Sequence, residues 1–105
     1  MPGLEAGFRD LVDRVVHGDG TASPELRSQA FDNQILTSPL DTLIGKVATD
    51  PATITDADFA AAEAAGYSQD QLFELVVCAA VGQSSRQYEA GLAALAEALG
   101  AGDAP

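Results

Sequence analysis

The chain has 105 residues, the size of a single domain, and its 16 acidic and 5 basic side chains give a net charge of -11. This charge repels phosphate backbones and anionic bilayers, so neither nucleic acid nor a membrane surface is an expected partner. The single cysteine, Cys78, excludes an intramolecular disulfide, and no run of about 18 apolar residues marks a membrane span, so we expect a soluble, cytoplasmic protein.

Alanine accounts for much of the 47% hydrophobic composition. It buries little area per residue and suits helices that pack closely against one another. A core built in this way is thin at this chain length, and packing against partner subunits would add to it.

The first predicted helix ends at His17. Gly18 and Gly20 follow it and favour a left-handed stop and a turn. His17 is the only histidine, and we expect its imidazole to cap carbonyls at the negative end of the helix dipole. The apolar face of this helix repeats at intervals of three and four residues, with Leu4, Phe8, Leu11, Val12, Val15 and Val16 as its members.

Two Ser-Pro pairs predict the next two helix starts. Ser23 precedes Pro24 and Ser38 precedes Pro39, and each pair combines a favoured N-cap with a favoured first helical residue. The segment 33–37 between these helices reads as a bend. Asp50 and Pro51 should close the second of them.

A capping box predicts the following short helix. Thr55 is its N-cap, with Asp58 three residues later, and Gly66 ends it in a left-handed conformation. Ser68 and Gln71 repeat the capping pattern at the start of another helix.

The helix that starts after Ser68 is the predicted centre of the fold. From residue 72 to 81 nearly every side chain except Glu74 is apolar, which predicts a helix surrounded by others. Propensity leaves open whether Gly82 is a joint or lies within one continuous helix. A narrower apolar stripe follows, composed of Tyr88, Leu92, Leu95 and Leu99.

No alternation typical of β-strands competes with these helical patterns. We therefore predict an all-α fold, a compact multi-helix domain of about five to six helices over residues 1–99. Residues 100–105 are predicted to form a disordered tail.

Several of these features occur together in one order. A threonine-capped helix is followed by Ala-Gly-Tyr-Ser, by Glu74 in an apolar helix, by Ala-Val-Gly ending at Gly82, by Arg86, and by Gly91-Leu92. This order resembles the carboxymuconolactone decarboxylase and alkylhydroperoxidase D-like superfamily, specifically its small members. The resemblance is best from residue 40 to 95. Upstream, a weaker match lies in the spacing of Gly18, Gly20, Pro24, Leu26 and Arg27.

The resemblance implies a helical domain that packs into homo-oligomers, commonly trimers or hexamers. In the peroxidase branch of the superfamily, a Cys-x-x-Cys pair with a nearby histidine precedes the turn at the position of Gly66. The corresponding segment 43–66 of this chain has neither cysteine nor histidine. A thiolate that attacks a peroxide needs a resolving thiol to complete the cycle, which one thiol per chain does not supply.

Glu74, Cys78 and Arg86 are the candidate catalytic residues. Free cysteine in an apolar helix more often packs as a small hydrophobe, and the Glu74 carboxylate one turn away disfavours a thiolate. If the helix continues, Glu74 and Arg86 are separated by about 18 Å of helix rise, too far for an ion pair within the helix. A structural role for Glu74 and Arg86 is favoured over acid or base catalysis.

Two functional hypotheses follow. The leading one is a superfamily member without the dithiol site, acting as an oligomeric accessory or small-molecule-binding protein. The alternative is a decarboxylase-like or hydroperoxide-reducing enzyme with a pocket around Glu74, Cys78 and Arg86. We expect no cofactor and no metal, since His17 and Cys78 do not form a ligand set. A superficial similarity of segment 40–43 to acyl carrier proteins is disfavoured because Thr42 stands where those proteins carry a serine.

Overall fold

A computed structural model describes residues 2–34 and 36–103, with side chains for residues 6–34 and 36–100. All regular structure in these ranges is helical, which confirms the predicted all-α class. The helices are α1 (Pro2–His17), α2 (Pro24–Phe31), α3 (Leu40–Thr49), α4 (Asp56–Ala64) and α5 (Gln69–Asp103), with a single 3-10 turn, η1 (Pro51–Thr53), between α3 and α4.

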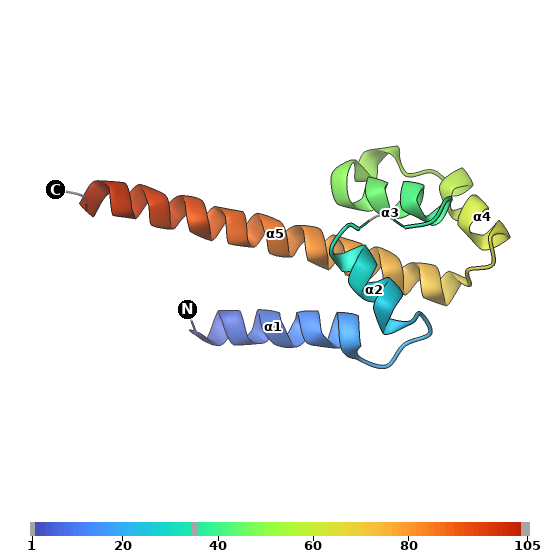
Figure 1. Ribbon diagram of the computed structural model, residues 1–105, viewed down its shortest axis with the longest axis horizontal. Helices are drawn as coiled ribbons and strands as arrows, with labels where there is room; N and C mark the ends of the chain where they lie inside the picture. The colour runs from blue at the N-terminus through green and yellow to red at the C-terminus, as the bar shows by residue number, and fades with distance from the viewer. Residues whose placement is uncertain (1, 35, 104–105) are drawn as a thin grey trace.

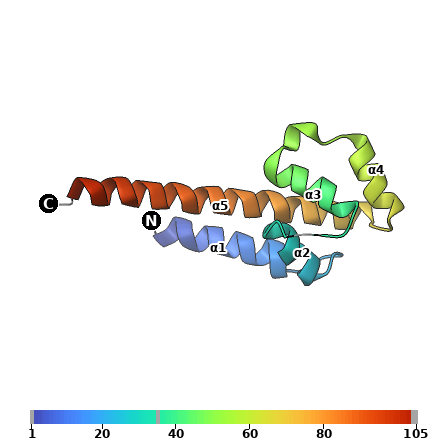
Figure 2. The ribbon, with the colours of Figure 1, turned by 45° about the horizontal axis from the view of Figure 1, so that its top comes forward.

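The long helix α5 organises the molecule (Figure 1). Helices α2, α3 and α4 gather around its first half, and α1 runs back alongside its middle. In both ribbon views the second half of α5 projects beyond this cluster (Figure 2). The molecule is consequently elongated, with principal dimensions of 60 × 29 × 19 Å.

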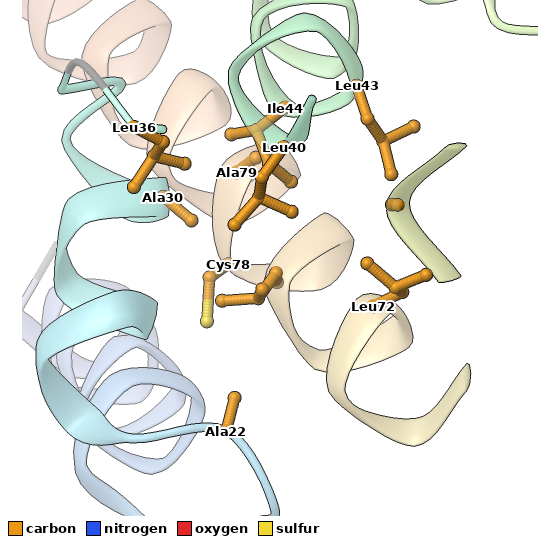
Figure 3. Close-up of a cluster of buried hydrophobic side chains, with 11 residues drawn as sticks. Ala22, Ala30, Leu36, Leu40, Leu43, Ile44, Leu72, Cys78 and Ala79 are labelled. Carbon is orange, nitrogen blue, oxygen red and sulfur yellow. The ribbon is translucent and has the colours of Figure 1, made fainter. Parts of the chain in front are cut away.

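The core lies where α2 and α3 pack on the first half of α5 (Figure 3). Small side chains such as Ala30 and Ala79 allow the helices to approach closely, and leucine and isoleucine side chains from α3 fill the space between them. The largest of the fully buried side chains are Leu40, Leu43, Ile44, Leu72, Leu75 and Cys78.

Most of the predicted caps are present. Ser23 Oγ accepts the Leu26 amide at 3.2 Å. Ser68 and Gln71 bond reciprocally, with the Gln71 amide 3.1 Å from Ser68 Oγ and the Ser68 amide 2.9 Å from Gln71 Oε1. Gly66 ends α4 with φ of 109°, a conformation that glycine adopts without steric cost.

The predicted cap at Ser38 is wrong. Helix α3 begins at Leu40, one residue later than Pro39, and has no side-chain cap. The Thr37 carbonyl instead accepts the amides of Leu40 at 3.0 Å and Asp41 at 3.3 Å. Backbone groups therefore make the bonds that the serine hydroxyl was expected to make.

One expectation for α5 needs correction. Its segment 72–81 is not surrounded, because Phe73 is 70% exposed and Ala80 is also exposed. The sequence left open whether the helix breaks at Gly82, and one helix runs through this position. The helix is described to Asp103, and residues 104 and 105 of the predicted tail lie outside the described part of the chain. The domain end at residue 99 stays a prediction.

Candidate functional site

The Glu74 carboxylate closes the loop between α1 and α2. Its Oε1 lies 2.8 Å from the Thr21 amide, and its Oε2 accepts the Ala22 amide at 3.0 Å and the Thr21 hydroxyl. Both oxygens are thus used in holding this loop to α5. A charge-assisted bond to a backbone N–H is stronger than a neutral one, so Glu74 stabilises the loop by more than an uncharged side chain would.

Arg27 is buried directly beneath the same loop, with 3% of its surface exposed. Its guanidinium donates to three backbone carbonyls, those of Ala22 at 3.1 Å, Val15 at 3.3 Å and Gly18 at 2.7 Å. Val15 lies in the last turn of α1 and Gly18 directly follows this helix, so Arg27 rather than His17 satisfies carbonyls there.

Gly20 allows this loop to lie close to α5. A Cβ at this position would collide with Glu74 Oε1 and would lie 3.5 Å from Arg27 Cζ. The Gly18, Gly20 and Arg27 spacing noted in the sequence therefore corresponds to one structural unit, a loop held between a buried cation and a carboxylate.

The surroundings of Glu74 act on its pKa in opposite directions. Burial raises the pKa of this carboxyl, while hydrogen bonds from Thr21 and Ala22 and the charge of Arg27 lower it. The lowering outweighs the effect of burial, and the pKa lies below its ordinary value. Glu74 is therefore ionised at neutral pH.

The Cys78 thiol is fully buried one turn along α5 from Glu74 (Figure 3). Its Sγ donates to the Val15 carbonyl at 3.4 Å. Burial raises the pKa of the thiol, the charge of Arg27 lowers it and the charge of Glu74 raises it, so that the pKa is about 11. The thiol is protonated at neutral pH, which disfavours nucleophilic attack from this sulfur.

Arg86 lies at the other end of α2. Its Nη1 donates to the Phe31 carbonyl at 2.7 Å and its Nη2 to Gln83 Oε1 at 3.1 Å. Phe31 is the last residue of α2, so this guanidinium satisfies a carbonyl that has no partner within the helix. The same carbonyl approaches Gly82 so closely that a Cβ there would collide with it.

The three candidate catalytic residues therefore lie on one helix but have separate partners. Glu74 binds the α1–α2 loop, Cys78 contacts the last turn of α1, and Arg86 binds the end of α2. Within residues 6–34 and 36–100 no cluster of three or more metal-ligating side chains is found.

A pocket of about 520 Å³ lies between α1, the end of α2 and the middle of α5. Phe8 and Tyr88 form part of its wall, with ring centroids 5.6 Å apart. The sequence assigned both aromatic residues to apolar stripes, which gave no sign that α1 and α5 leave a hollow between them. The lining residues are Phe8, Arg9, Val12, Asp13, His17, Phe31, Ser85, Tyr88, Glu89 and Leu92.

A smaller hollow of about 340 Å³ lies between α4 and the start of α5, and Phe59, Leu72, Phe73 and Val76 supply its apolar wall. It has few polar groups, with Glu63 and Gln69 at its edge. The pocket between α1 and α5 combines apolar walls with acidic, basic and hydroxyl groups, which makes it the better candidate for specific binding.

The search for a helix able to cross a membrane, made over the described part of the chain, finds none. Comparison of the chain with protein-family models, with curated proteins and with solved structures gives no match in any of the three.

Proposed function

We propose that this chain is a small-molecule-binding or accessory protein, and that its ligand occupies the pocket between α1 and α5. The observation that carries the proposal is the pocket itself, about 520 Å³ with apolar walls and a few polar groups. Ligand sites for small molecules typically measure roughly 300–1,000 Å³ and have this composition. Membership in the carboxymuconolactone decarboxylase-like superfamily, without its dithiol site, and assembly into a trimer or hexamer rest on the sequence resemblance.

The lining suggests the kind of ligand. The rings of Phe8, Phe31 and Tyr88 offer flat apolar surface, while Arg9 and His17 on α1 offer hydrogen-bond donors. Asp13 and Glu89 also line the pocket, so a small molecule with an aromatic body and a hydrogen-bond-accepting edge placed at Arg9 and His17 fits this combination.

The fluorescent probe 8-anilinonaphthalene-1-sulfonate has that chemistry and tests the site directly. We expect saturable binding at one site per chain. Ser85→Trp would fill the pocket from α5, because Ser85 is half-buried and lines it. The neighbouring Ser84 is exposed and does not line it, so Ser84→Trp is a matched control.

We expect Ser85→Trp to weaken probe binding at least about tenfold, a loss of about 1.4 kcal/mol, and Ser84→Trp to leave it unchanged. Absence of saturable binding, or equal weakening by both variants, would refute this pocket as the binding site. Native mass spectrometry of the untreated protein would additionally reveal any small molecule retained through purification.

The enzymatic alternative remains a separate prediction. A decarboxylase-like or hydroperoxide-reducing activity would depend on Glu74, Cys78 and Arg86. Turnover of a hydroperoxide with an external thiol, abolished by Cys78→Ser, would support it. Unchanged turnover in the variant would remove Cys78 from any such mechanism.

A further inference from the structure

The second half of α5 carries apolar surface that nothing in the chain covers. Every residue from 89 to 100 is exposed, including Leu92 at 42%, Leu95 at 56% and Leu99 at 61%. In both ribbon views the end of α5 extends beyond the start of α1 (Figures 1 and 2), whereas Glu89 and Leu92 line a pocket together with residues of α1. An isolated helical segment of this length is marginal in water, because most helical stability in proteins comes from packing of an apolar face.

The size of the exposed surface points to a missing partner. The chain exposes 6669 Å², whereas a compact monomer of 10.8 kDa should expose about 5,500 Å². Its radius of gyration is 16.5 Å, against about 13 Å for a compact domain of this length. The excess of about 1,100 Å² exceeds the roughly 800 Å² that each partner buries in a typical stable interface.

The stripe is complementary to itself, with Leu92, Leu95 and Leu99 exposed and Tyr88 half-buried against Phe8 of α1. Tyr88, Leu92, Leu95 and Leu99 follow one another at intervals of four, three and four residues, the spacing of a coiled-coil seam. When two such helices run antiparallel, Leu92 of one faces Leu95 of the other, and Tyr88 faces Leu99. Four residues flank this stripe on the helix, Glu89, Gly91, Ala96 and Ala98, and all except Glu89 are small. Small flanking residues allow the helix axes to come close together.

We propose that the segment 88–99 of α5 packs antiparallel against the same segment of a second copy, around a two-fold axis between Leu92 and Leu95. Such a contact is isologous, so both copies bury the same stripe. The antiparallel arrangement places the two packed clusters of helices at opposite ends of the seam, and it aligns the helix dipoles favourably. A two-fold contact is a component of a dimer or a hexamer, but a trimer lacks it.

The contact also covers the pocket between α1 and α5. Tyr88 and Leu92 belong both to the pocket wall and to the seam, so the partner's Leu95 and Leu99 would lie over its open side. The idea that this contact encloses a ligand rests on the proposed function, whereas the contact between the two copies does not depend on that function.

Sedimentation velocity and native mass spectrometry on the full chain test the contact without any ligand. We expect the unmodified chain to form a dimer or a hexamer. The double variant Leu95→Glu/Leu99→Glu should form an assembly of half that mass, a monomer or a trimer respectively. The expected rise in Kd at the seam is at least about 100-fold, because two new charges from each copy would have to be desolvated there. Ala90→Glu/Ala94→Glu adds the same charge to the opposite face of the same helix and should keep the parent mass.

A monomer or a trimer in the unmodified chain would overturn the proposal, as would equal disruption by both double variants. Circular dichroism should show both variants folded, since all four positions are exposed. Because the seam residues are uncharged and each chain carries a net charge of -11, salt should strengthen the contact. Dissociation by salt would contradict it. Probe binding measured separately distinguishes the outcomes: assembly without probe binding refutes the proposed function alone.

Discussion

Replacing Gly82 with alanine perturbs the crossing of α2 and α5 at its closest point. The new Cβ would collide with the Phe31 carbonyl oxygen and would lie 2.7 Å from its carbonyl carbon and 2.9 Å from its Cα. Carbon atoms in contact are about 3.5 Å apart or more, and the collision with the oxygen is closer still, so the two helices would have to separate by about 1 Å or more. The obstructing atoms belong to backbone, which has no rotamer to change.

Two opposing effects set the magnitude. Overpacking in a close-packed core costs about 1–3 kcal/mol, and a rigid backbone neighbour places this site near the upper value. Alanine also gains about 1 kcal/mol over glycine inside a helix. We therefore expect Gly82→Ala to lower the free energy of unfolding by about 2 kcal/mol, and the melting temperature by about 10 °C.

Urea and thermal denaturation followed by far-UV circular dichroism measure this loss at equal protein concentration. Gly45 in the middle of α3 supplies the control, because a Cβ built there meets nothing within 4 Å. Gly45→Ala should be neutral or stabilise by up to about 1 kcal/mol. If Gly82→Ala is as stable as Gly45→Ala, the argument from close approach is refuted.

Further outcomes concern the three candidate site residues. The folded-state pKa of Glu74 is lowered, so its carboxylate stabilises the fold above the unfolded pKa of about 4.3 and loses this effect as pH falls through the folded pKa. Glu74→Gln should lower the free energy of unfolding by about 1–2 kcal/mol at neutral pH and by less in acid. Urea denaturation at both pH values measures this loss, and a loss that does not change with pH would contradict the reasoning. Arg86→Met removes the charged donor to the Phe31 carbonyl and should lower the free energy of unfolding by about 1–2 kcal/mol; wild-type stability would show the bond to be unimportant. Cys78 should react with iodoacetamide at least about tenfold more slowly in folded than in unfolded protein, since its thiol is buried with a pKa of about 11. Mass spectrometry measures both alkylation rates, and equal rates would contradict the buried position.

Local patterns predicted the helices well wherever the interaction that ends a helix is itself local. Ser68 with Gln71 and the stop at Gly66 involve residues within a few positions of one another, so the sequence contains the whole interaction. The failure at Ser38 has a different reason, which lies in the kind of group that makes the bonds. There the Thr37 carbonyl satisfies the first amides of α3, and a backbone group leaves no signature in residue type.

The candidate site could be predicted only in part. Glu74 and Cys78 were singled out because a carboxylate and a thiol stand out in an apolar helix. Their partners could not be identified, since Thr21 lies 53 positions from Glu74 and Val15 lies 63 from Cys78. Arg27 attracted notice only through its spacing from Gly18 and Gly20, although it is the buried cation of the site.

The sequence by itself determined that the chain is helical, where most helices begin and end, and which face of each is apolar, because these depend on neighbouring residues and on a fixed period of 3.6. Tertiary structure alone decided that Glu74 and Arg27 hold one loop, that Arg86 binds the end of α2, and that α1 and α5 leave a pocket between them. It also revealed that the apolar stripe from Leu92 to Leu99 remains uncovered. A stripe in a sequence has the same pattern whether it packs within its own chain or against another, and only the arrangement of the remaining helices distinguishes the two.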